Sequence, residues 1–173
     1  SAKRVSGRAD SMTSNPTVEP EYRSSTTGSP SSTGPAISPM LRNIHTGWGG
    51  IQRRPNEEIV ILVSSLHHIA GLGLPFLFTD SHAYYQWADF YTDLADLDKI
   101  DWPLLQARDF KRDPEDPAKF ERYQAEALIH QHLPVGGLLG IVCYTEALKQ
   151  RIEQEIQARN LNLPVYARTG WYF

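Results

Sequence analysis

Cysteine is almost absent from this sequence, and long apolar runs and an excess of basic residues are missing. The single cysteine, Cys143, excludes an intrachain disulfide, which fits a reducing compartment. Its place in the apolar run 140–144 predicts a small buried side chain. No apolar run approaches the roughly 20 residues of a membrane span, and the N-terminus lacks the apolar core of a signal peptide. We therefore expect a soluble, cytoplasmic protein without membrane association.

The overall charge is slightly negative. The 173 residues include 17 Lys and Arg against 20 Asp and Glu, for a net charge of −3. This excludes a protein that is basic over its whole surface, while a local basic groove for nucleic acid stays possible. The length suits one domain with a real core and is too short for two.

Several common catalytic and binding motifs are absent. No serine lies in a nucleophile elbow, no phosphate-binding loop occurs, and Gly71-Leu72-Gly73 is too short for a dinucleotide fingerprint. His130 and His132 would share one face of a strand. However, no third ligand lies at metal spacing, and zinc needs three or four protein ligands. We expect no bound metal.

Residues 1–34 consist mainly of serine, threonine, glycine and proline. Too few apolar residues are present to offset the entropy that is lost on ordering, so a disordered or non-native segment is expected. The globular domain then comprises residues 35–173.

The rest of the sequence predicts short strands and helices that alternate in a mixed α+β domain. Apolar runs rich in β-branched or aromatic residues predict strands, at 58–63, 76–79, 124–128, 140–144 and 163–167. Capping residues followed by apolar residues at helical spacing predict helices, at 38–45, 65–70, 80–97 and 145–159. In the third helix we assign the aromatic stripe (Tyr84, Trp87, Tyr91) to the core rather than to a platform that stacks on bases. A turn at 100–103 is expected to anchor Trp102.

The last of these helices has the clearest ends. Thr145 can cap its first turn, and its apolar residues 148, 152 and 156 lie four apart on one face. Asn160 stands where a left-handed C-terminal cap is expected.

One glutamate stands at the start of an apolar run. In an extended strand Gln124, Glu126 and Leu128 would share one face, and a carboxylate there is costly to bury without a partner or a task. An acidic, proline-bearing segment, 113–117, precedes it and predicts an exposed loop. A loop that leads into such a strand is a plausible active-site layout. The residues alone favour the simpler interpretation, a glutamate on a surface strand.

Basic residues flank the acidic loop and could form a rim that faces phosphates; they are Lys111, Arg112, Lys119 and Arg122. Neighbouring acidic residues largely cancel their charge, so an ordinary solvated loop is the alternative interpretation.

Five stretches, taken in order, resemble one protein family. They are Ser38–Leu41, Phe78–Ala83, Ile100–Trp102, Gln124–Glu126 and Trp171–Phe173. In their order and spacing they resemble the DarT family of DNA ADP-ribosyltransferases, which are toxins of bacterial toxin–antitoxin systems. The resemblance covers residues 35–173.

The resemblance implies an ADP-ribosyltransferase-like fold, with a split mixed sheet around an NAD cleft and flanking helices. It also implies transfer of ADP-ribose from NAD to thymidine bases of single-stranded DNA, and a cognate antitoxin of the ADP-ribosylglycohydrolase type. Glu126 would be the catalytic glutamate, the acidic loop before it would recognise the substrate, and Lys119 and Arg122 would contact DNA phosphates.

The implied chemistry suits these residues. Cleavage of the nicotinamide–ribose bond develops oxocarbenium character, which a carboxylate stabilises. Single-stranded DNA is expected as the substrate because a base stacked in a duplex cannot be attacked.

Two departures from the family pattern support an alternative. Ile37 stands where the family has an arginine needed for catalysis, and no histidine precedes His45, although the first block of the family holds NAD through a His-x-Thr motif. We therefore expect a truncated, frame-shifted or degenerate copy that lacks one wall of the NAD cleft and leaves Leu62, Phe76 and Phe78 poorly covered. The alternative function is a catalytically impaired remnant that only binds single-stranded DNA or a partner protein.

Overall fold

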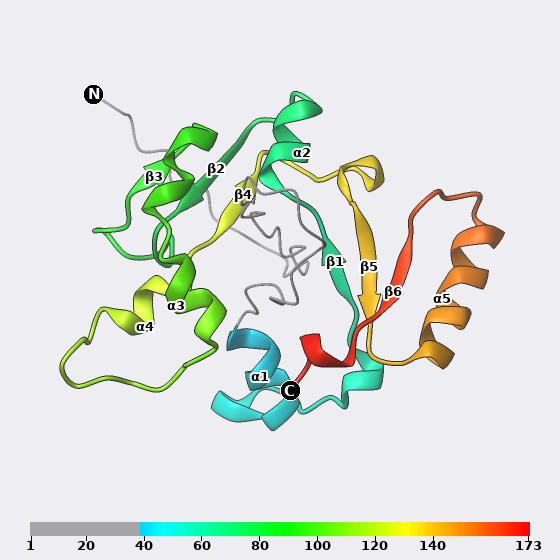
Figure 1. The fold of residues 1–173 in the computed structure, drawn as a ribbon, viewed down its shortest axis with the longest axis horizontal. Coiled ribbons are helices and arrows are strands. Elements are labelled where there is room, and N and C mark those ends of the chain that lie inside the picture. Colours follow the sequence, from blue (N-terminus) through cyan, green and yellow to red (C-terminus); the bar gives the residue numbers. More distant parts are fainter. Residues whose placement is uncertain (1–38) are drawn as a thin grey trace, which may run out of the picture.

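The computed structural model describes residues 39–173, which form two three-stranded sheets with helices around them (Figure 1). The first sheet has the strand order β1-β5-β6 and the second has the order β3-β2-β4. The strands are β1 (Ile61–Val63), β2 (Phe76–Thr79), β3 (Phe90–Tyr91), β4 (Ala127–Ile129), β5 (Gly140–Cys143) and β6 (Val165–Ala167). The predicted α+β class with a split sheet is confirmed.

The first sheet is mixed. β5 lies antiparallel to β1, with Leu62 opposite Ile141, and parallel to β6, with Val142 opposite Tyr166. Parallel neighbours need a crossover connection, and the helix α5 (Glu146–Ala158) supplies it. In the second sheet β2 is central and antiparallel to both neighbours.

Short helices connect and cover the strands. They are α1 (Pro39–Thr46), α2 (Leu66–Gly71), α3 (Trp102–Ala107) and α4 (Lys119–Arg122), with 3₁₀ turns η1 (Trp48–Gly50), η2 (Asn56–Glu58), η3 (Leu94–Lys99), η4 (Val135–Gly137) and η5 (Thr169–Trp171). Side-chain caps set several starts, because the first amides of a helix have no partner within it. Ser65 accepts from the His68 N–H at 3.2 Å, and Thr145 accepts from the Leu148 N–H at 3.2 Å.

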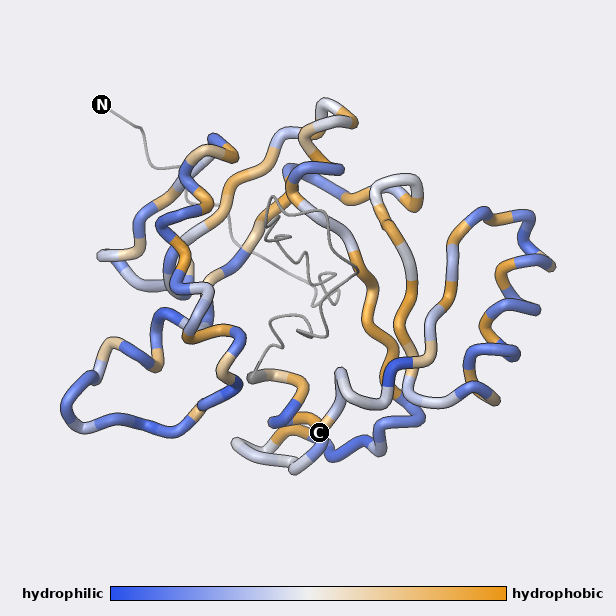
Figure 2. Tube along the Cα trace, viewed as in Figure 1, coloured by the Kyte–Doolittle hydropathy of each residue, from blue (hydrophilic) through white to orange (hydrophobic). Residues whose placement is uncertain are grey.

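The buried apolar side chains gather in clusters beside the sheets. One cluster belongs to the second sheet (Leu66, Phe78, Ile100), and two flank the first (Leu41, Val142, Tyr172; Cys143, Ile156, Val165). Figure 2 shows apolar residues along β1 and β5 and hydrophilic ones along the loop between α3 and α4. Cys143 is fully buried as predicted, and this burial raises the pKa of its thiol.

Most of the predicted elements are confirmed near their expected bounds. α1, α2, β2, β5, β6 and α5 all form, and Asn160 follows α5 with a left-handed φ of 54°. The strand expected from residue 58 begins only at Ile61, because residues 56–58 form η2 and only three residues of β1 pair with β5.

The long helix predicted over 80–97 is wrong. The segment holds β3 and the start of η3 instead, because Phe90 and Tyr91 pair with Thr79 and Phe78 of β2. The carboxylate of Asp80 accepts from the Asp89 N–H at 3.2 Å and closes a loop instead of capping a helix. The aromatic stripe is therefore not core: the exposed fraction is 85% for Tyr84 and 64% for Trp87.

Two further expectations are corrected. Trp102 begins the helix α3 rather than standing in a turn, because Asp101 caps that helix by accepting from the Leu104 N–H at 3.1 Å. Phe78, expected to be poorly covered, is only 2% exposed and stacks on Tyr91 at 5.4 Å. Leu62 and Phe76 are half-buried.

The predictions about residues 1–34 and about Ile37 lie outside the described residues. Within residues 39–173, none of the helices has both the length and the apolar character to cross a bilayer.

Candidate active site

Glu126 stands at the edge of the second sheet, between the loop that follows α4 and the first residue of β4. Its backbone is held by Thr79, the last residue of β2. The Thr79 N–H donates to the Glu126 carbonyl at 2.9 Å, and the Glu126 N–H donates to the Thr79 Oγ1 at 3.1 Å. The same threonine hydroxyl donates to the Ser81 carbonyl at 2.5 Å. Thr79 is fully buried, so these bonds fix the backbone of Glu126 to the buried end of β2.

His82 contacts the carboxylate of Glu126. The distance from His82 Nδ1 to Glu126 Oε1 is 2.8 Å, and the two side chains are 40% and 35% exposed. An ionised carboxylate only accepts hydrogen bonds, so this contact places the proton on Nδ1. The Tyr84 N–H lies 3.4 Å from the same nitrogen, and the shorter carboxylate contact decides the tautomer. Glu126 is thus oriented by a side chain 44 residues earlier in the sequence.

The sequence alone does not predict a role for His82. It lies in the stretch Phe78–Ala83, which carried part of the resemblance, and comes three residues after the end of β2. The signal that could have found it is topological: residues after β2 and before β4 meet at the same sheet edge, because the two strands are antiparallel neighbours.

The expectation that Gln124 shares a strand face with Glu126 is wrong. A turn at residues 123–124 follows α4, and β4 begins only at Ala127. The Gln124 side chain points back and donates to the Phe120 carbonyl at 2.8 Å. The last carbonyls of the short helix need partners outside it, and the N–H groups of Gln124 and Ala125 also supply them.

The predicted acidic loop is exposed and is held at its base by Arg122. The guanidinium contacts both Asp116 oxygens, at 3.1 and 2.7 Å, and its Nε lies 3.0 Å from Asp101 Oδ2. The hydrogen bond from Arg122 lowers the pKa of Asp116, and the two carboxylates raise the pKa of Arg122. Because Asp101 also caps α3, one arginine ties the loop to the start of that helix.

Lys119 makes a second ion pair near the base of the loop, with Asp109. Its Nζ lies 2.8 Å from Asp109 Oδ2, and its side chain is only 11% exposed. Both basic residues predicted to contact DNA, Lys119 and Arg122, therefore have carboxylate partners. By contrast, Arg112 has no carboxylate partner among the described residues and lies over the Phe120 ring at 5.6 Å.

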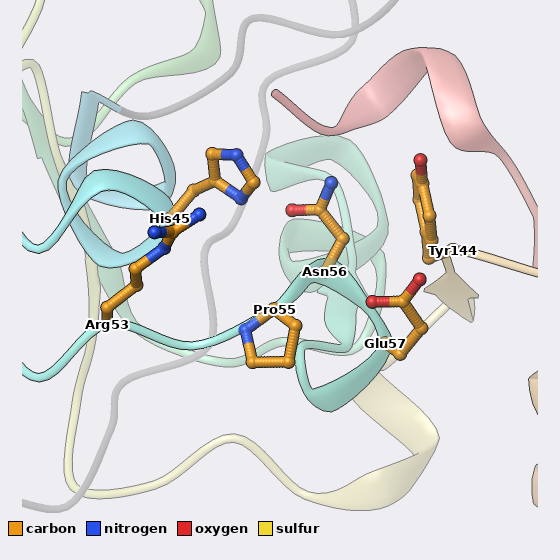
Figure 3. A pocket seen from close by; sticks show the side chains of 6 residues that line it. All are labelled: His45, Arg53, Pro55, Asn56, Glu57 and Tyr144. Carbon is orange, nitrogen blue, oxygen red and sulfur yellow. The ribbon is translucent and has the colours of Figure 1, made fainter.

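A pocket of about 430 Å³ lies elsewhere, between α1, the segment before β1 and the end of β5 (Figure 3). Its lining consists of His45, Arg53, Pro55, Asn56, Glu57 and Tyr144. Asn56 donates to the Phe173 carbonyl at 2.8 Å, while its Oδ1 and the His45 Nδ1 are buried without a partner in residues 39–173. None of the predicted site residues lines this pocket.

The geometry around Glu126 supports a specific kind of chemistry. A part-exposed carboxylate with a fixed backbone and one oxygen held by a histidine can stabilise a positive charge that develops on a bound substrate. The residues 39–173 hold no group of three His, Cys, Asp or Glu side chains that could bind a metal.

Comparisons with known proteins identify a family for this chain. Residues 35–173 match the family model for ssDNA thymidine ADP-ribosyltransferase, DarT. A DNA ADP-ribosyl transferase of Escherichia coli O127:H6 is 65% identical over 137 residues, which make up 79% of this chain and 63% of that protein. The matched part thus spans less than two thirds of that relative.

Solved structures of DarT from Thermus sp. 2.9 have the same fold. The complex with NAD+ matches with a TM-score of 0.68 and 30% identity, over 79% of this chain and 68% of the other. The complex with ADP-ribosylated ssDNA matches with a TM-score of 0.68 and 31% identity, over 79% of this chain and 64% of the other. The family model covers most of the sequence and a relative of known name is 65% identical, so the chain belongs to the DarT family.

Proposed function

We propose that this protein transfers ADP-ribose from NAD to thymidine bases of single-stranded DNA, with Glu126 as the catalytic carboxylate. The observation that carries the proposal is the contact between His82 and Glu126 at the sheet edge, 2.8 Å. The family match supports the reaction type, and the named complexes of the Thermus relative support NAD and single-stranded DNA as substrates.

Glu126 would act on the ribose of NAD. The bond between the nicotinamide nitrogen and the ribose C1′ breaks, and its electron pair leaves with nicotinamide. The negative charge of Glu126 stabilises the positive charge that develops on the ribose. A ring nitrogen of thymine then forms a bond to C1′, and the proton that this nitrogen loses passes to water. His82 holds one oxygen of Glu126, which reduces the ways in which the carboxylate can rotate away from the sugar.

We also propose that the basic residues at the base of the acidic loop meet the DNA phosphates. Arg122 has five N–H donors and Lys119 has three, and the contacts with Asp101, Asp116 and Asp109 leave some of them unused. A phosphate could therefore bind without breaking the ion pairs. The role expected from the resemblance, a toxin paired with an ADP-ribosylglycohydrolase antitoxin in the cytoplasm, is part of the same proposal.

The reaction is tested by mass spectrometry of DNA. The protein is incubated with NAD and a thymine-containing single strand, and the expected product carries the added mass of one ADP-ribosyl group. Glu126→Gln should abolish the product, and the control Glu146→Gln, on the exposed side of α5, should not. Product formation by Glu126→Gln at the parent rate, with both proteins folded, would overturn the role of Glu126.

A second function rests on Ile37, which replaces the arginine expected from the family pattern. In this case the protein binds single-stranded DNA or a partner protein without turnover. The two functions differ in their response to NAD, since a ligand at 100 times its dissociation constant adds about 2.7 kcal/mol of stability. A clear rise in melting temperature with NAD, followed by transfer, supports the enzyme. No rise and no transfer, with DNA still bound, supports the remnant.

A further inference from the structure

An exposed group of aromatic rings lies between β2 and β3. The Tyr85 and Trp87 rings are stacked, with centroids 5.0 Å apart and an interplanar angle of 13°. Tyr84 meets Tyr85 edge to face at 6.1 Å. Tyr84 and Trp87 are 85% and 64% exposed. Stacked rings that remain open to solvent in a helix-free loop are not explained by core packing.

One end of this group of rings lies beside His82, which contacts Glu126. His82 binds Glu126, and its own ring lies 5.9 Å from the Tyr85 ring and 6.4 Å from the Tyr84 ring. At the other end, Trp87 Nε1 donates to Glu121 Oε2 at 2.6 Å. Because Glu121 is part of α4, this bond holds the indole against the helix that leads to Glu126. The surface therefore has a fixed orientation relative to the site.

The charges near these rings select the kind of partner. Glu121 contacts Trp87, and Asp80 and Asp89 are hydrogen-bonded to each other across the loop that carries the rings. This loop therefore carries negative charge, which repels phosphate groups. The flat faces of nucleobases carry no net charge and stack on aromatic side chains with little dependence on sequence.

We propose that Tyr84, Tyr85 and Trp87 form a stacking surface for the bases next to the thymidine that is modified. This inference rests on the proposed function, which supplies single-stranded DNA as the substrate. The rings would hold the neighbouring bases in line while the target base reaches the ribose at Glu126. They would thus contribute to DNA affinity and positioning rather than to the cleavage of NAD.

The test is the binding of a fluorescein-labelled oligothymidine single strand to the full chain without NAD, followed by fluorescence anisotropy. Trp87→Ala should raise the Kd roughly 5- to 150-fold, the range that corresponds to the loss of one base stack. Trp87→Phe keeps a ring but loses the bond to Glu121, and should recover most of the affinity. The slope of log Kd against log salt should stay the same, because stacking neutralises no phosphate.

A matched control and a modified strand sharpen the test. Trp48 in η1 is also 64% exposed and is not part of the ring group, so Trp48→Ala should bind like the parent. A strand with abasic sites beside one thymidine should bind the parent weakly and should remove the difference between the parent and Trp87→Ala.

Several results would overturn the inference. One is an affinity of Trp87→Ala for the strand that equals that of the parent. If the oligomeric state of this variant also changes, the rings bind a second copy of the chain instead of DNA. Another is equal loss in Trp48→Ala, and a third is a parent protein that does not bind the strand. DNA binding that depends on Trp87, without any transfer of ADP-ribose, would instead remove the proposed reaction and leave the stacking surface in place.

Discussion

Thr79 and Glu126 extend the pairing of β2 and β4 by one residue, and they do so through a side chain as well as the backbone. The Thr79 hydroxyl takes the place of a strand carbonyl and accepts from the Glu126 N–H at 3.1 Å, 47 residues away in sequence. The position of the candidate catalytic residue therefore depends on a buried hydroxyl of a neighbouring strand.

Replacement of Thr79 by valine should lower both stability and transferase activity. The change leaves the Glu126 N–H and the Ser81 carbonyl without their partner, and each unsatisfied buried group costs about 1–3 kcal/mol. Thr79→Ser keeps the hydroxyl and is the control. Urea unfolding and transfer to a thymine strand are measured for both variants. Equal stability and activity of the two would show that the hydroxyl does not matter.

His82→Ala should lower kcat without unfolding the protein. The side chain is 40% exposed, so little packing is lost, while Glu126 loses the donor that orients it. Loss of one hydrogen bond to a charged group corresponds to a decrease in rate of roughly ten- to hundredfold. His82→Gln can still donate and should retain more activity. His130→Ala, at an exposed position after β4, is the control, and an equal loss in that variant would argue against a specific role.

Arg122→Lys should release the acidic loop. A lysine ammonium cannot contact both Asp116 oxygens and Asp101 in the manner of the planar guanidinium. Limited proteolysis should then cut between residues 108 and 118 several times faster than in the parent. Arg159→Lys changes an exposed pair with Glu155 on α5 and should leave the cleavage rate unchanged. Unchanged cleavage in Arg122→Lys would show that other contacts hold the loop.

A fall in pH should weaken the ion pairs that Arg122 and Lys119 make with Asp116 and Asp109. The pKa of Asp116 is lowered by the hydrogen bond from Arg122, and that of Asp109 by the hydrogen bond from Lys119. A lowered folded-state pKa gives stability that is present above the ordinary carboxyl pKa, about 4, and is lost as the pH falls through the lowered value. The stability difference between the parent and Asp116→Asn should therefore shrink from about pH 6 to about pH 3. A difference that does not change with pH would contradict the ion pair.

Local signals explain which elements the sequence predicts correctly. Thr145 caps α5 through its hydroxyl, and the apolar residues of α5 repeat on one face of the helix. Both signals are local in sequence, so the helix can be predicted without knowledge of its tertiary contacts. β2 and β5 are short apolar runs with aromatic or β-branched residues, a composition that favours strands. In these cases the local preference and the final packing agree.

Tertiary contacts explain what the sequence did not predict. The residues 84–94 have helical spacing, yet the pairing of Phe90 and Tyr91 with β2 outweighs it. His82 contacts Glu126, and Arg122 contacts Asp101. The members of each pair are far apart in sequence, so no helical or strand periodicity predicts that they meet. Glu126 itself was found through the family resemblance, since the residues alone favoured a plain surface position.

The chain order of the two sheets has a consequence for folding. β1 and β5 are hydrogen-bonded neighbours, yet the whole second sheet lies between them in sequence, in residues 64–139. For β1 to pair with β5, the chain must close a loop that comprises residues 64–139. Closure of so long a loop is slow. The unit β5-α5-β6 is local and can form first, with β1 joining last. Thr79, His82 and Glu126 all lie in this inserted segment, so its local unfolding would dismantle the site while β5, α5 and β6 stay intact.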